Sequence, residues 1–177
     1  LSTGTKTCFT VKDVPAQDFI KAYADYLKKN DKIKLPAVNI SDCISNSLGI
    51  DYVKTGVAKD LAPEDPTGST PELVHNEYLG NILAAIARKV YLRAHIGVGT
   101  LKHIYGHNKR NGCRRRHHST GAGKIIRFSL QQLEQLGVVA KDKKCLEKKW
   151  SRVITPQGQK DLDIIANNIG KEIYKQK

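Results

Sequence analysis

The sequence is poor in features that mark several common classes of protein. Aromatic residues make up only 6% of the 177 residues, which argues against the large base-stacking platform of single-strand-binding proteins. No apolar run approaches the ~18 residues needed to cross a bilayer. Residues 1–13 also lack the apolar core of a signal peptide. We therefore expect an intracellular protein with no membrane partner.

Closely spaced cysteines are also absent. Cys8, Cys43, Cys113 and Cys145 are too far apart to form a zinc knuckle or a dense disulfide framework. Reduced thiols in the cytosol fit this pattern best.

One group of residues comes close to the spacing of metal ligands, and it consists of His107, Cys113, His117 and His118. No second cysteine pair supports this group, so we predict no metal site.

Acidic residues are missing altogether from residues 88–127, and this is the most informative absence in the chain. The same stretch carries +11 of the net charge of +13. Like charges repel and destabilise a compact state unless a polyanion neutralises them, and nucleic acid is the commonest such partner. The basic residues are Arg88, Lys89, Arg93, Lys102, Lys109, Arg110, Arg114, Arg115, Arg116, Lys124 and Arg127.

Motifs of enzymes are also missing. Five of the six histidines lie within residues 88–127, but acid–base catalysis needs a positioned pair, and no carboxylate lies nearby. The pair Gly123-Lys124 is followed by Ile where a phosphate-binding loop has Ser or Thr, and Gly97-Val-Gly99 lacks the third glycine of a dinucleotide site. We predict no catalytic residue, no cofactor and no small-molecule substrate.

Apolar periodicity predicts a mainly helical single domain over residues 1–177. A first helix is expected from Asp13, as its cap, to Asn30, and a long central helix from about Leu73 to Ala94. The Gly97-Val-Gly99 turn should then lead to a short helix capped by Thr100. Residues 39–50 and 143–151 have the polar composition of loop insertions. Residues 107–123 contain almost nothing that could enter a core, so we predict a basic loop that binds RNA.

The last third has the order of a winged helix-turn-helix. A helix capped by Ser119 or Thr120 should run to Leu136 and end at Gly137 in the left-handed region. Two strand-like runs follow, at 138–140 and 150–154, and would form the wing. Thr155-Pro156 should open a final helix. The expected fold is mainly α, a winged-helix-like domain with a small β-hairpin wing.

Two other binding functions compete with RNA binding. A winged-helix DNA-binding transcriptional regulator would share the positive charge and the last third of the chain. However, the basic loop and the central helix lie outside its recognition helix, which favours a broad RNA surface. A membrane-surface protein would need Trp, Phe or Leu beside the cations on an exposed amphipathic helix, and no such segment is present.

Five runs of sequence carry a specific resemblance. They cover about half the residues and read TVKDVPAQDFIKAYADYLKK (10–29), DYVKTGVAKDLAPEDP (51–66), IARKVYLRAHIGVGTLKHIYGHNKRNG (86–112), LQQLEQLGVVAKD (130–142) and ITPQGQKDLDIIA (154–166). With them the chain resembles the eukaryotic and archaeal small-subunit ribosomal protein nineteen family. The resemblance implies a winged-helix-like protein of the subunit head that binds ribosomal RNA, contacts neighbouring small-subunit proteins and is needed for RNA maturation. It also implies passage through the nucleolus to cytoplasmic ribosomes.

The chain departs from that family at a few positions. Tyr78 stands where the family has Trp, Ile82 replaces its first helical Arg, and residues 113–118 replace a run containing Pro and an aromatic residue. We carry no RNA role onto Tyr78 or Ile82.

The predicted RNA contacts combine cations that neutralise phosphates with glycines that let backbone N–H groups approach them. They are Arg88, Lys89, Arg93, Gly97, Gly99, Lys102, Lys109, Arg110, Arg114, Arg115, Arg116, Lys124 and Arg127.

Overall fold

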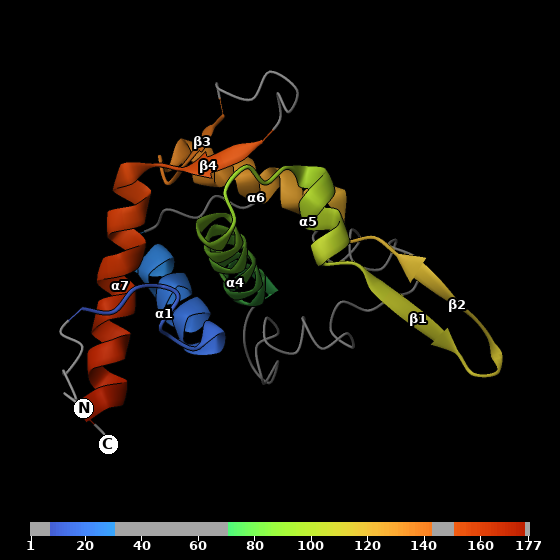
Figure 1. Cartoon of the computed structure of the whole chain (residues 1–177), viewed down its shortest axis with the longest axis horizontal. Coiled ribbons are helices and arrows are strands. Elements are labelled where there is room, and N and C mark those ends of the chain that lie inside the picture. The colour runs from blue at the N-terminus through green and yellow to red at the C-terminus, as the bar shows by residue number, and fades with distance from the viewer. Residues whose placement is uncertain (1–7, 31–70, 143–150, 176–177) are drawn as a thin grey trace, which may run out of the picture.

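The computed structural model describes residues 8–30, 71–142 and 151–175, and shows a mainly helical, winged-helix-like arrangement with two small antiparallel sheets (Figure 1). The predicted fold class is therefore confirmed. The elements are α1 (Ala16–Lys29), α4 (Pro71–Leu92), α5 (Val98–Ile104), β1 (His107–Asn111), β2 (Arg114–Ser119), α6 (Gly123–Gln135), β3 (Val139–Lys141), β4 (Arg152–Ile154) and α7 (Pro156–Lys175).

The central helix α4 organises the core. It packs against α1, α6 and β4, while α1 also contacts α7. Its buried side chains include Leu79, Leu83, Ile86 and Val90, as the periodicity predicted. Ala85 is buried as well, so little of the α4 surface between Leu79 and Val90 is left for polar side chains.

Three predicted helix caps are wrong. Pro15, not Asp13, is the N-cap of α1. The Asp13 carboxylate instead accepts hydrogen bonds from the Thr10 backbone N–H (3.0 Å) and hydroxyl (2.9 Å), closing the preceding turn. The helix α5 begins at Val98 with Gly97 as its N-cap, so Thr100 lies inside the helix. The Leu101 N–H already donates to the Gly97 carbonyl at 3.1 Å.

The third misplaced cap precedes α6. Ser119 ends β2 and Thr120 follows it, and Ala122 is the N-cap. By contrast, Thr155 opens α7 as predicted, because its hydroxyl accepts a hydrogen bond from the Gly158 N–H at 2.9 Å.

The wing is built as the sequence predicted. Gly137 ends α6 with φ +73°, and the N–H groups of Gly137 and Val138 bond back to Glu134 (3.0 Å) and Leu133 (3.1 Å). The chain then enters β3, which pairs with β4 in the register Val139↔Ile154.

Ile96, from the loop between α4 and α5, forms an antiparallel β-bridge with Arg152 of the wing. Two backbone hydrogen bonds, of 2.8 and 3.2 Å, join the two residues.

Residues 107–119 form a β-hairpin, so the predicted loop is wrong over this range. The strands β1 and β2 pair antiparallel from His107↔Ser119 to Asn111↔Arg114. Gly112 provides the positive φ (+66°) at the first central position of the turn, as type II′ turns require. The loop was predicted because no residue here could enter a core, but a projecting hairpin needs no core.

The predicted insertion at 39–50, and residues 143–150 of the second one, lie outside the described residues. Within 8–30, 71–142 and 151–175, no helix combines the length and apolar character needed to cross a membrane.

Candidate nucleic-acid interface

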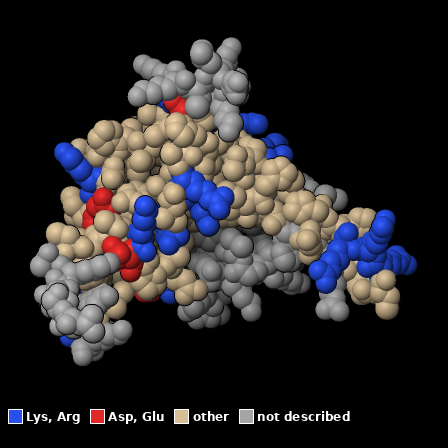
Figure 2. All heavy atoms as spheres, in the orientation of Figure 1, with Lys and Arg blue, Asp and Glu red and all other residues tan. Residues whose placement is uncertain are grey.

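The β1–β2 hairpin projects from the helical body as a basic arm (Figure 1). Figure 2 shows Lys and Arg gathered on it, whereas the acidic atoms visible on that face lie on the other half of the molecule. Arg114, Arg115 and Arg116 of β2 are all exposed. Lys109 and Arg110 lie on the paired strand β1.

Both faces of β2 carry positive charge. Side chains alternate along a strand, so Arg114 and Arg116 share one face with His118, while Arg115 and His117 lie on the other. All five are exposed. An arm of this composition has no apolar face to pack on protein, and isolated hairpins are marginally stable in water. A polyanion in contact with both faces would supply the missing stabilisation.

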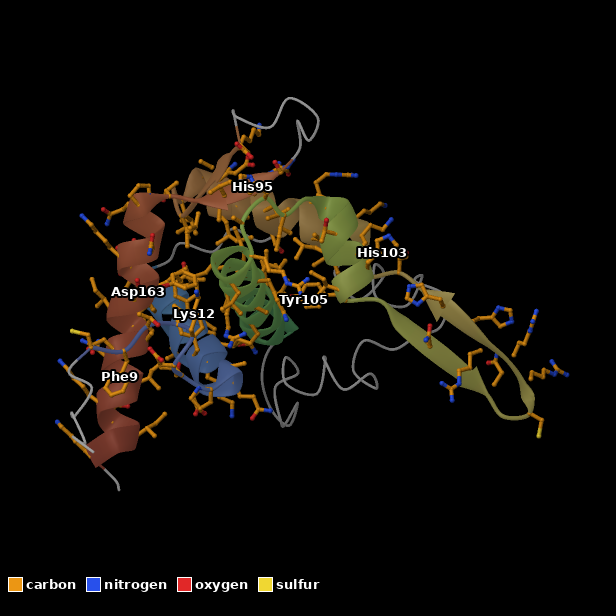
Figure 3. All side chains as sticks on the ribbon, in the orientation of Figure 1. Phe9, Lys12, His95, His103, Tyr105 and Asp163 are labelled. Carbon is orange, nitrogen blue, oxygen red and sulfur yellow. The ribbon has the colours of Figure 1, made fainter. Side chains whose placement is uncertain are left out.

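The base of the arm is tied to α5 and α6. His103 lies at the end of α5 (Figure 3). Its ring stacks on that of His118 in β2, with ring centroids 6.4 Å apart. The Gly121 N–H donates to the Lys102 carbonyl (2.9 Å). The Lys102 side chain also packs over Gly123, because a Cβ added to Gly123 would lie only 3.3 Å from the Lys102 Cδ. Lys102 and Lys124 are thereby placed near the hairpin base.

The helix α6 has one buried apolar face and one exposed polar face. Ile126, Leu130 and Leu133 are buried. The exposed residues on the other side are Lys124, Arg127, Gln131 and Gln135. In winged-helix proteins, the helix before the wing commonly lies against nucleic acid. The structure therefore joins predicted contacts from α5, β2 and α6 into one region.

A second group of predicted contacts belongs to α4 and the segment after it. Arg88 and Lys89 are half-buried, and Arg93 is exposed beyond the helix end. The Arg88 Nε is buried without a hydrogen-bond partner in the described parts of the chain. Gly97 caps α5. Gly99 lies within α5, and a Cβ added to it would meet nothing within 4 Å.

Two further cations have structural partners. The Arg152 Nε donates to Glu134 Oε1 at 2.6 Å, and Lys141 Nζ lies 3.8 Å from Glu134 Oε2. Arg152 is 6% exposed, so this pair joins α6 to the wing and is not part of a phosphate-binding surface.

The stacked pair of His103 and His118 at the hairpin base was not predicted from the sequence. Strand alternation over residues 114–118 was the signal that could have placed His118 on the same face of β2 as Arg114 and Arg116.

Possible metal ligands are dispersed over the hairpin. Cys113 is exposed in the turn, while His118 lies near the base, bonded to Asn108 Oδ1 through Nδ1 at 2.8 Å. The described residues contain no group of three His, Cys, Asp or Glu side chains that could hold a metal ion.

Comparison with known proteins agrees with the resemblance seen in the sequence. The family model of ribosomal protein S19e matches residues 10–172. Small ribosomal subunit protein eS19 of Entamoeba histolytica is 40% identical over 162 residues, 92% of this chain and 87% of that protein. The Oryza sativa subsp. japonica eS19 is 39% identical, with 92% and 94% of the two chains covered. The Dictyostelium discoideum eS19 is 36% identical, with 97% and 96% covered. This chain belongs to the ribosomal protein S19e family.

Proposed function

We propose that this protein is a structural constituent of the small ribosomal subunit that binds ribosomal RNA. The observation that carries the proposal is the family match over residues 10–172, with relatives that are each named as small ribosomal subunit protein eS19. The basic arm and the exposed face of α6 support the RNA-binding part. Members of the matched family are named as ribosomal proteins and not as enzymes.

Phosphate neutralisation is the proposed mechanism. The exposed arginines of β2 would enter between phosphates, and Lys124 and Arg127 of α6 would bind the backbone near the hairpin base. Arginine suits this role because its planar guanidinium donates two parallel hydrogen bonds to phosphate oxygens. The half-buried Arg88 would contribute its positive charge where RNA reaches the α4 surface.

Assembly of the subunit is the second part of the proposal. A cationic arm without a protein-packing face would be stabilised only once RNA surrounds it, so its binding would favour a particular RNA arrangement. On this basis the protein takes part in small-subunit RNA maturation in the head region. It contacts neighbouring small-subunit proteins and passes through the nucleolus before reaching cytoplasmic ribosomes.

Sucrose-gradient sedimentation of a native lysate tests the proposal, with the protein followed by mass spectrometry. We expect it to travel in stoichiometric amount with the small subunit and to remain there after a moderate salt wash. Recovery in the light fractions or with chromatin would overturn the proposal and favour the DNA-binding regulator.

A further inference from the structure

We infer that the stacked imidazoles of His103 and His118 form a binding site for an unpaired RNA base, flanked by cations that take the adjoining phosphates. This inference rests on the proposed RNA-binding function and specifies the RNA chemistry that one part of the surface recognises.

The two rings have the geometry of a stacking platform. Their planes differ by 9°, and their centroids are 6.4 Å apart, within the range of offset-stacked aromatic pairs. Both side chains are exposed. A flat nucleobase can therefore extend the stack without a rearrangement of the core.

The position of His118 is fixed before any ligand arrives. Its Nδ1 is 2.8 Å from Asn108 Oδ1, on the residue paired with it across the hairpin. His103 is held by α5, whose Leu101 is fully buried. Because the His118 ring is already oriented and α5 holds the backbone of His103, binding a base costs less side-chain ordering than binding between two free side chains would.

Cations lie on the elements that carry or adjoin this platform. Lys102, the neighbour of His103, packs over Gly123, and the exposed Lys124 follows at the start of α6. Arg116 shares the β2 face of His118, two residues away. Stacking on an aromatic ring combined with cations along the backbone is how proteins bind bases in single-stranded loops and bulges. A paired base inside a helix cannot reach such a platform.

The test compares two RNAs and three substitutions in the full-length protein. One RNA is a stem-loop with a 2-aminopurine in its single-stranded loop, and the other is a fully paired duplex. His118→Ala removes one ring of the stack, and His118→Phe keeps a ring in place. His117→Ala is the matched control, because it removes the neighbouring exposed imidazole from the opposite face of β2.

We expect His118→Ala to weaken stem-loop binding about 5- to 100-fold and to relieve the quenching of 2-aminopurine, with little change in duplex binding. His118→Phe should retain both, and His117→Ala should resemble the original protein. Equal behaviour of His118→Ala and His117→Ala would overturn the inference while leaving RNA binding intact. Equal loss of stem-loop and duplex binding in His118→Ala would also overturn it, because the pair would then only hold the arm. Failure of the unaltered protein to bind either RNA would overturn the proposed function as well.

Discussion

Gly158 in the first turn of α7 has no room for a side chain. A Cβ there would lie 2.3 Å from the Val138 carbonyl oxygen and 2.8 Å from its Cα. Because the obstacle is backbone, the wing would have to move. We expect Gly158→Ala to lower the free energy of unfolding by about 1–3 kcal/mol, measured by urea denaturation.

Gly99 is the matched control for that substitution. It also lies in a helix, but a Cβ there would meet nothing within 4 Å. Gly99→Ala should therefore be neutral or stabilise the protein by up to about 1 kcal/mol, through lower entropy of the unfolded chain. If the two substitutions had the same effect, the close approach of α7 to Val138 would be wrong.

Single positions show where sequence reasoning succeeds and where it fails. Gly137 was predicted correctly because a left-handed φ at a helix end strongly favours glycine. Asp13 and Thr100 were predicted as caps and are not, because the N-caps of α1 and α5 are Pro15 and Gly97, and neither helix start is capped by a side chain. The Asp13 carboxylate is occupied by Thr10, and that local choice depends on the path of the chain before the helix.

At the scale of elements, one carboxylate joins α6 to the wing. Glu134 accepts from the Arg152 Nε at 2.6 Å, where the Arg152 side chain is 7% exposed, whereas Lys141 is 63% exposed and 3.8 Å away. We expect Glu134→Ala to cost about 1.5–3 kcal/mol of stability, since it removes a hydrogen bond between charged groups from a poorly hydrated site.

Lys141→Ala provides the comparison. The stability of both variants is measured by thermal unfolding. An exposed ion pair contributes about 0–1 kcal/mol, so this substitution should change stability little. Similar small losses in both variants would mean that Arg152, and not its pairing with Glu134, holds the wing.

A tyrosine joins the central helix to the last one. The Tyr91 hydroxyl donates to Asp163 Oδ1 at 2.8 Å, and burial together with this hydrogen bond raises the pKa of Tyr91 to about 12. Tyrosine in the unfolded chain ionises near pH 10. The contribution of this group to stability is therefore complete below about pH 10 and is lost as the pH rises towards about 12.

Tyr91→Phe should remove that part of the alkaline sensitivity. The variant should be less stable than the original protein near neutral pH, where the hydrogen bond is intact, and the difference should shrink between about pH 10 and 12. Thermal unfolding across this range measures it. Burial also raises the pKa of Tyr23, so some alkaline sensitivity should remain. A constant difference at all pH values would contradict the role of Tyr91.

The elements also differ in how well the sequence predicted them. Helices α1, α6 and α7 bury one apolar face, and periodicity reveals such a face directly. The helix α4 is buried on nearly all sides over residues 82–87, and its apolar composition predicted this. The side chains of the β1–β2 hairpin that the structure describes bury almost nothing, so reasoning from burial gave a loop. Gly112 was the available signal, because a glycine at the first central position is typical of two-residue type II′ hairpin turns.

At the scale of the whole molecule, the sequence predicted the charge of the candidate site but not its geometry. Residues 88–127 could be identified from their one-signed charge. Strand formation divides Arg114 and Arg115 between the two faces of β2. The ion pair of Arg152 with Glu134 depends on a contact between segments that are distant in the sequence. A linear pattern does not contain these contacts.

The arm and the opposite side of the molecule offer matched charge reversals. Arg114→Glu with Arg116→Glu alters one face of β2, and Lys160→Glu with Lys171→Glu makes the same change in net charge on exposed positions of α7. In Figure 1, α7 lies across the body from the arm. Neither pair includes a buried residue, so both variants should unfold at the temperature of the original protein.

Salt dependence of RNA binding distinguishes the two variants. An interface with 6–10 phosphate contacts loses about 10³- to 10⁵-fold in affinity between ~50 and ~200 mM salt on duplex DNA, which is a rough guide for RNA. Each lost phosphate contact lowers the slope of log affinity against log salt by about 1, so the arm variant should lose about 2. The α7 variant should keep the original slope. Equal slopes in both variants would show that RNA responds only to net charge, and the arm would then not be the interface.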